Sequence, residues 1–324
     1  MTKHIGRKVE AAIAIEDTRG VGKAPTYSLG KVDFSLYDKT MDGRDESSIG
    51  RIEDSMDKFV LEKYAQGQIG GVLGANSALY LLALAFGGTP TVSTVSDSRY
   101  PWTLALSNTN QHSSASLLIK DSNQTQLHKL VMINQLEITI EQDDLVRWSA
   151  EFVSKRAVTS TQSIPTYAED YKFTKRKSKI YVASAVGSLS AATRLALKSF
   201  KMTINKNLVR DSAIGTVEPV DIQNQQLGIE GELMLNYDDQ TYRNLMLNGT
   251  YRALRLSMES EKLIGATSYG DLTLDFAKCD FFGWEPDAPN DEIVSNTINF
   301  KTNWDLTTAT MLNAGTVRNA RSAL

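Results

Sequence analysis

The side chains best suited to catalysis or metal binding are few in this sequence of 324 residues. It contains three histidines, His4, His112 and His128, and one cysteine, Cys279. No two histidines are three or four residues apart, so a helical histidine pair for a metal ion is absent. A single cysteine excludes an intramolecular disulfide and a multi-cysteine zinc site. We interpret His112 and His128 as polar strand or loop positions and Cys279 as a small core residue. We predict no catalytic, cofactor-binding or metal-binding residues, and no enzymatic activity.

Two short segments resemble ligand-binding loops but lack essential residues. The run Gly20-Val-Gly-Lys looks like part of a phosphate-binding loop, yet Asp17 replaces its first glycine and Ala24 stands where serine or threonine is required. The segment 38–43 resembles the start of a calcium loop, but Ile49 occupies the position of the bidentate glutamate. We therefore expect a flexible loop before residue 32 and a surface turn, rich in Asp, Gly and Ser, through residue 50.

The charge balance argues against a protein that holds nucleic acid over a broad surface. There are 35 basic and 38 acidic residues, a net charge of −3, whereas proteins that wrap nucleic acid are usually basic. The one strongly basic run is 172–179, with aromatic residues interspersed. We interpret it as a solvated linker or as a contact with an acidic neighbouring subunit. The longest apolar run, 78–86, is far too short to cross a bilayer, and acidic residues interrupt the segment where a signal sequence would be apolar.

Much of the chain alternates apolar and polar residues, which is the pattern of strands with one buried face. The clearest case is 136–153, where two alternating runs flank the turn Gln142-Asp-Asp and predict a hairpin. Further strands are expected at 32–36, 58–73, 102–106, 117–119, 200–204, 254–258, 272–276 and 298–304.

Two helices are predicted among these strands. The first covers 76–86, is apolar on every side and should be buried, with Asn76 or Ser77 as its cap and Gly87 after its end. The second covers 239–247, with Asp238 as its cap.

The two halves of the chain show the same order of elements, which predicts an internal duplication. Each half has a strand, a loop, a glycine-containing strand, a short helix and further strands. An offset of 161 aligns Gly70 with Gly231 and Gly88 with Gly249. The alternative is two β-rich modules whose order is similar by coincidence. We predict a first module at 1–160, a linker with the basic run at 161–190, and a second module at 191–324.

Together these features resemble the phage major tail tube proteins, specifically the type in which a tube module occurs twice. The resemblance extends from about residue 30 to residue 305. It rests on the polar loop 38–50, the glycine-spaced strand with the apolar segment 74–87 after it, the hairpin 136–153, and the stretch 200–208 with Gly215 and Pro219 beyond. The order of elements carries the match.

The resemblance implies a mainly β fold (α+β) of two similar β-sandwich or half-barrel modules, each with a flanking helix. Neighbouring modules would join into a ring-shaped β-barrel, with three chains giving pseudo-sixfold symmetry, and rings would stack into a hollow tail tube that conducts the genome during infection. The implied partners are further copies of the chain, the tape-measure, tail-terminator and tail-tip proteins, and DNA that passes without specific binding. No cofactor or membrane is implied. The expected location is the virion tail, after synthesis in the host cytoplasm.

Two other hypotheses stay open at this point: a β-rich binding or decoration module (adhesin-like, or the tube of a secretion apparatus), and a hydrolase on a β scaffold. Under the tube hypothesis, the loop 38–51 becomes ordered only on assembly and contacts the adjacent ring. The acidic face of hairpin 136–153, with Glu137, Glu141, Asp143 and Asp144, then lines the lumen. The alternative is that this face meets a neighbouring subunit and these acids pair with the basic run 172–179.

Overall fold

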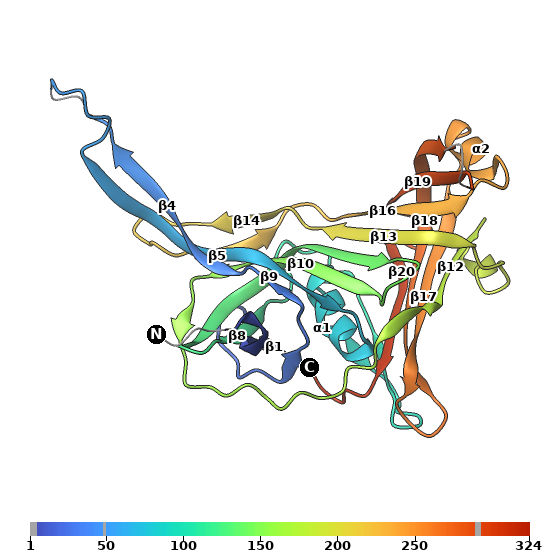
Figure 1. Cartoon of the computed structure of the whole chain (residues 1–324), viewed down its shortest axis with the longest axis horizontal. Coiled ribbons are helices and arrows are strands. Elements are labelled where there is room, and N and C mark those ends of the chain that lie inside the picture. Colours follow the sequence, from blue (N-terminus) through green and yellow to red (C-terminus); the bar gives the residue numbers. More distant parts are fainter. Residues whose placement is uncertain (1–4, 48–49, 289–292) are drawn as a thin grey trace.

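The computed structural model describes residues 5–47, 50–288 and 293–324, which are mostly β-strand (Figure 1). These residues include two α-helices, α1 (Ala75–Phe86) and α2 (Thr241–Leu247), and two 3-10 turns, η1 (Gly6–Lys8) and η2 (Val186–Ser188). The strands are β1 (Glu10–Ile15), β2 (Tyr27–Leu29), β3 (Asp33–Phe34), β4 (Tyr37–Asp45), β5 (Asp57–Val72), β6 (Thr91–Val92), β7 (Tyr100–Thr103), β8 (Ala115–Lys120), β9 (Thr125–Ile140), β10 (Arg147–Lys155), β11 (Val158–Thr159), β12 (Phe173–Ala183), β13 (Leu197–Asn205), β14 (Leu208–Asp211), β15 (Asp221–Asn224), β16 (Gly228–Asn236), β17 (Arg252–Leu263), β18 (Tyr269–Asp287), β19 (Ser295–Thr302) and β20 (Leu312–Asn319). The prediction of a mainly β fold with short helices is confirmed.

Eight strands form one continuous sheet in which every neighbouring pair is antiparallel. The order is β4-β5-β10-β9-β13-β16-β19-β18, and β3 continues β4 along the same edge of β5. Because successive side chains point to opposite faces, the register gives each face its own rows. One row on the core side consists of Gly71, Trp148, Ile138, Met202, Gly231, Phe300 and Phe281. This face therefore carries the large apolar residues that drive folding.

Two further groups of strands pack outside the eight-strand sheet. Their orders are β2-β1-β8-β9-β11 and β12-β17-β18-β20-β7-β6. The long strands β9 and β18 belong to both layers. Strand β9 pairs with β8 as far as Val131 and with β10 from Met132 onward. Leu130, beside this change of partner, has a φ of 53°, so a local kink lets one strand turn from one layer into the other.

Helix α1 lies between the layers and is buried along its whole length. It contacts β9, β20, β18 and β1, which confirms the prediction of a buried helix that is apolar on every side. Gly87 ends it with a φ of 73°, as a left-handed C-terminal residue. The predicted cap at Asn76 or Ser77 is wrong. Gly74 is the N-cap, and the carboxylate of Asp170, remote in sequence, accepts hydrogen bonds from the first turn.

Helix α2 starts later than predicted, and its predicted cap Asp238 is also wrong. Gln240 is the N-cap, and the Asp239 carboxylate accepts a hydrogen bond from the Thr241 amide at 2.8 Å. Leu245 is buried, and the Tyr242 ring meets Phe281 edge-on with centroids 5.3 Å apart. The helix thus covers β18. No helix in the described parts of the chain combines the length and the apolar character needed to span a membrane.

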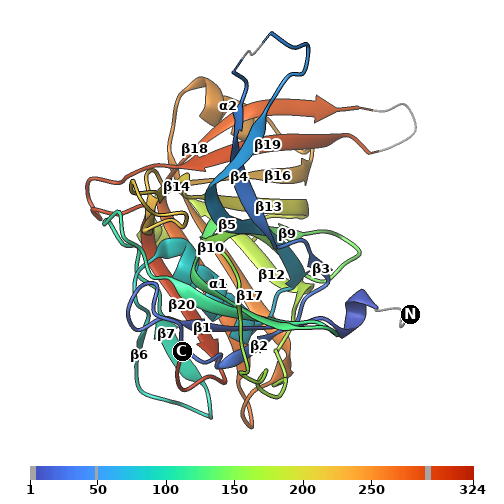
Figure 2. The same cartoon turned by 90° about the vertical axis from the view of Figure 1, so that its left-hand side faces the viewer.

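The predicted surface loop 38–51 is wrong over its first half. Its residues up to Asp45 belong to β4, which pairs with β5 from Tyr37 opposite Gln66 to Asp45 opposite Asp57. Strand β10 ends opposite Tyr64, so the β4–β5 hairpin continues without a third strand. Figures 1 and 2 show it projecting from the body of the molecule. Ile49 lies outside the described residues, and ordering on assembly stays a prediction.

Several of the predicted strands are confirmed by the structure. The hairpin 136–153 is confirmed as the β9–β10 pair, with Arg147 opposite Thr139. The strands predicted at 117–119, 200–204, 254–258 and 272–276 lie within β8, β13, β17 and β18. The strand predicted at 32–36 shortens to β3. Within the predicted linker 161–190, residues 173–183 form β12 and pair with β17. The division into two modules stays a prediction.

Candidate functional site

The two histidines that the structure describes and the cysteine are buried. His112 is 1% exposed, and burial, aided by the positive charge of Lys206, lowers its pKa to about 4. Burial also lowers the pKa of His128. Cys279 is 0% exposed, and burial raises the pKa of its thiol to about 12, so it has little thiolate character. His4 lies outside the described residues.

Charged side chains of the two motif fragments take part in ion pairs. In the segment 20–23, Lys23 forms an ion pair with Asp17 at 2.8 Å. Asp42 lies on the exposed hairpin and pairs with Lys58 at 2.9 Å. Within residues 5–47, 50–288 and 293–324, no group of three or more His, Cys, Asp or Glu side chains is arranged to hold a metal ion.

The most distinctive chemical surface is the polar face of the eight-strand sheet. One cross-strand row passes from edge to edge through Asp33, Gly70, Ser149, Glu137, Thr203, Glu230, Lys301 and Asp280. We call this the polar row. It has four acidic side chains and one basic side chain, so its net charge is −3. Ordinary strand alternation produces it: the residues next to its central members, such as Trp148 beside Ser149 and Ile138 beside Glu137, are buried and face the core.

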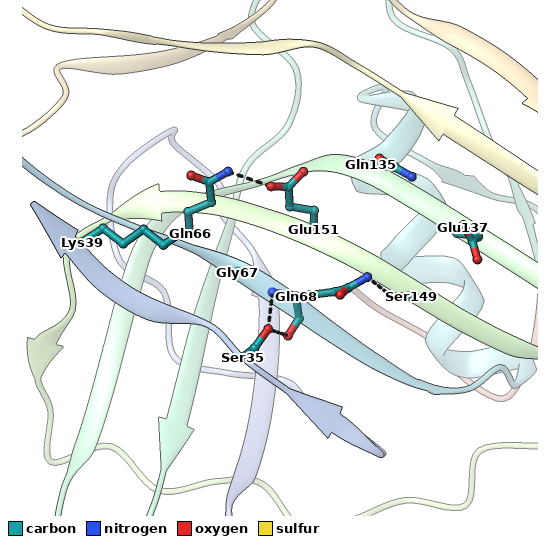
Figure 3. Close-up of a pocket in the computed structure, with 9 residues that line it drawn as sticks. All are labelled: Ser35, Lys39, Gln66, Gly67, Gln68, Gln135, Glu137, Ser149 and Glu151. Carbon is teal, nitrogen blue, oxygen red and sulfur yellow. Dashed lines mark hydrogen bonds between the residues drawn. The ribbon is translucent and has the colours of Figure 1, made fainter. Parts of the chain in front are cut away.

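Side-chain hydrogen bonds tie the polar face together (Figure 3). Gln66 donates to the Glu151 carboxylate at 2.7 Å, and Gln68 donates to the Ser149 hydroxyl at 2.6 Å. These groups line a hollow of about 290 Å³, together with Ser35, Lys39, Gly67, Gln135 and Glu137. Large apolar side chains are absent from this lining. A hollow of this kind holds water well and offers little to anchor a drug-sized ligand.

Gly67 allows the edge strand to approach this surface closely. A Cβ atom at that position would lie 2.1 Å from the carbonyl oxygen of Ser35 and 2.6 Å from the Cα atom of Leu36. Glycine is therefore required where the chain passes from β3 to β4 beside β5.

The acids of hairpin 136–153 have several different partners. Glu137 pairs with Lys201 of β13 at 2.8 Å. Asp144 pairs with Arg147 of its own hairpin. Only Asp143, in the turn, pairs with the basic run, through Lys175 at 3.2 Å. The predicted alternative, in which this face meets a neighbouring subunit and the acids pair there with 172–179, stays a prediction.

Residues 173–179 of the basic run belong to strand β12, and much of the run's charge is balanced within the chain. Lys172 donates to the buried Asp170 at 2.9 Å, and Arg176 pairs with Glu261 at 2.6 Å. Lys177 donates to the Ser260 carbonyl oxygen at 3.0 Å. The interpretation of this run as a solvated linker is thus replaced by a strand of the outer layer. Its contact with a neighbouring subunit stays a prediction.

Sequence reasoning missed two features of the structure. One is the apolar exposure of the projecting hairpin, where Met41, Phe59 and Leu61 are between 48% and 57% exposed. A run of apolar residues at 59–61 without strict alternation was the available signal. The other is the buried cation of Lys206, which no local pattern reveals.

The family model for phage tail tube proteins matches residues 6–302, nearly the whole chain. A search of curated proteins found no match.

Proposed function

The chain belongs to the phage tail tube protein family, and from this membership we propose that three copies close, edge to edge, into one ring of the tube. A member of this family is a structural component of the virion that assembles with other tail proteins into the tail tube. The family is structural and not enzymatic. The β-rich binding module and the hydrolase are not favoured.

The observation that carries the proposal is the direction of the two sheet edges. Strands β3 and β4 form one edge, and the C-terminal half of β18, from Asp280 to Asp287, forms the other. In the described part of the chain, each edge pairs with a strand on one side only. Because the eight strands alternate in direction, the first strand, β4, and the last strand, β18, run in opposite directions. Head-to-tail neighbours can therefore pair β4 with β18 in antiparallel fashion, which removes both exposed edges.

The strand order supports an internal duplication. In the first half, the four strands of this sheet are β4, β5, β9 and β10 in chain order. Their order in the sheet is β4-β5-β10-β9, that is, first, second, fourth and third. In the second half, β13-β16-β19-β18 repeats this order. In each half a helix, α1 or α2, follows the second strand. Each half thus supplies four strands, and three chains supply six such units.

The size and the chemistry of such a ring suit genome passage. Three chains with eight strands each, spaced by about 4.8 Å and tilted as barrel strands are, give a backbone diameter of roughly 45 Å. That leaves a lumen wide enough for duplex DNA. The apolar face packs against α1 and the outer layers, so the face left for the lumen carries the polar row. Its net negative charge offers DNA phosphates few cations to bind. Tape-measure, tail-terminator and tail-tip proteins are the further partners we propose.

Hydrogen–deuterium exchange on monomers and on assembled tubes tests the edges directly. We expect amides in β4 and in residues 280–287 to become protected on assembly, because edge pairing gives them partners. Strand β1, already paired on both sides by β2 and β8, is the internal control and should change little. Image averaging of the same tubes should show three chains per ring. A ring of six full-length chains, or edges that exchange equally fast in both states, would contradict the proposal.

A further inference from the structure

The projecting part of the β4–β5 hairpin is an apolar, acidic arm. We define the arm as residues 40–47 and 50–61. Six of its large apolar side chains are at least 40% exposed: Met41, Ile52, Met56, Phe59, Val60 and Leu61. A two-stranded hairpin is marginally stable by itself in water, and apolar exposure of this extent marks an interaction surface.

The arm is also charged. Residues 40–61 contain six acidic and three basic side chains, a net charge of −3. Glu53 and Asp54, at the tip, are exposed. A partner surface should therefore combine apolar contact with basic residues.

Such a surface exists at the opposite end of the eight-strand sheet. A hollow of about 640 Å³ lies where β9 ends and β13 begins. We call it the basic hollow. Its lining includes the cations Lys175, Arg176, Arg194 and Lys198 and the apolar side chains Leu195 and Phe200. Glu141 and Asp143 are its only acidic lining residues, which leaves a net charge of +2.

Two of these cations are available for a partner. Lys175 and Arg176 already pair with Asp143 and Glu261. Within the described residues, neither Arg194 nor Lys198 takes part in an ion pair. Arg194 is exposed and Lys198 is half-buried, so both can reach an incoming carboxylate.

The positions of the arm and the basic hollow decide which copy can bind. Strand β5 enters the sheet from the arm and ends at Val72 opposite Arg147, the residue at which β10 begins. The basic hollow adjoins that far end, beside Ile140 and Leu197. Figure 1 shows the arm leaving one end of the molecule, while the start of β13 lies at the other. An arm cannot reach the hollow of its own chain.

We propose that the arm of one copy docks into the basic hollow of a copy in the next ring, which fixes the stacking of rings. The proposal rests on the ring assembly proposed above. Each chain has one arm and one hollow at opposite ends of its strands, so a ring of three presents three arms to three hollows. Simultaneous binding at three sites raises the strength of stacking well above that of one contact.

A charge-swap experiment tests the contact. The arm variant combines Glu53→Lys with Asp54→Lys, and the hollow variant combines Arg194→Glu with Lys198→Glu. Each alone places like charges in contact, so we expect rings that form normally but tubes shortened by about tenfold. A combined variant, which carries all four changes in the same chain, restores opposite charges and should recover long tubes. Arg243→Glu on α2, outside the hollow, is the control and should leave tube length unchanged.

Ring formation is measured by native mass spectrometry and tube length by negative-stain microscopy, with circular dichroism to verify folding. Threefold rings whose stacking is unaffected by either variant would overturn the inference and leave the ring proposal intact. Failure of the combined variant to recover length would also overturn it. So would normal tubes that fail only to join another tail protein, because the hollow would then bind that protein. Absence of rings from the unmodified chain would contradict the proposed function itself.

Discussion

Lys206 is a fully buried cation that joins the two halves of the chain. It follows β13, and its ammonium group donates to the carbonyl oxygen of Leu84, in the last turn of α1, at 2.8 Å. The negative end of the helix dipole favours a cation there. Burial, together with the nearby positive charge of Arg19, nevertheless lowers its pKa to about 7.

The lowered pKa of Lys206 predicts a pH dependence of stability. The unfolded chain keeps this lysine protonated up to about pH 10.5, whereas the folded chain releases the proton near pH 7. Between these values the unfolded state binds more protons, so the free energy of unfolding should rise with pH, by up to about 1.4 kcal/mol per unit. Lys206→Met should flatten this rise in urea titrations at pH 7 and pH 9.5. The exposed Lys120→Met is the control, and an equal slope in both variants would refute the assignment.

Asp170 secures α1 from the segment between the proposed modules. Its carboxylate accepts from the amides of Asn76 and Ser77 at 2.9 and 3.2 Å and from the Ser77 hydroxyl at 2.6 Å. Its side chain is 0% exposed. A Cβ at Gly74 would lie 2.3 Å from the same carboxylate, which explains the glycine at the N-cap.

Replacing this cap should destabilise the protein. Asp170→Ala leaves two buried amides without acceptors, and we expect a loss of about 2–4 kcal/mol in the free energy of unfolding. Glu169→Gln, at the adjacent and exposed carboxylate, should cost less than about 1 kcal/mol. Chemical denaturation of both variants measures the difference. Similar losses at the two positions would show that the cap contributes little.

Strand β16 depends on a glycine at one position and not at another. A Cβ at Gly231 would lie 2.1 Å from the carbonyl oxygen of Lys201 and 2.6 Å from the Phe300 ring, whereas a Cβ at Gly228 meets nothing within 4 Å. Gly231→Ala should therefore cost about 1–3 kcal/mol through forced strand displacement. Gly228→Ala, in the same strand, should be nearly neutral. Thermal unfolding compares the two, and equal melting temperatures would contradict the packing argument.

The elements that sequence patterns predicted are those whose signals are local. Helix α1 is apolar throughout and is followed by a glycine, and the hairpin around Asp143 alternates on both sides of a polar turn. Strand β4 escaped prediction because its residues, such as Asp42 and Gly43, do not alternate. It is a strand because β5 lies beside it. Strand β12 was not predicted, because its many lysines conceal the alternation in which Ser178 and Ile180 are buried and Lys179 between them is not. The cap by Asp170 and the contact of Lys206 depend on tertiary placement, which no local pattern encodes.

At the scale of the whole molecule, the even number of strands in the sheet and the polar character of one of its faces point to the same assembly. An even number of antiparallel strands lets identical chains close head to tail without a parallel junction. The register that brings Trp148 and Phe300 into the core also brings Glu137 and Glu230 to the opposite face. Closure through the edges and a negatively charged lumen are thus two consequences of one alternation.

The charge of that face predicts the effect of reversing it. Glu137→Lys together with Glu141→Lys adds cations to the face proposed to line the lumen, and each cation within reach of a phosphate releases about one counterion. Repetition over three chains and many stacked rings should slow DNA release from phage particles, most strongly at low salt, where screening is weak. Tubes should still form. Glu10→Lys with Asp17→Lys, the same charge change on exposed residues outside the eight-strand sheet, is the control and should not slow release. If the Glu137 and Glu141 variant cannot form rings, the face is an interface between subunits and the lumen assignment is wrong.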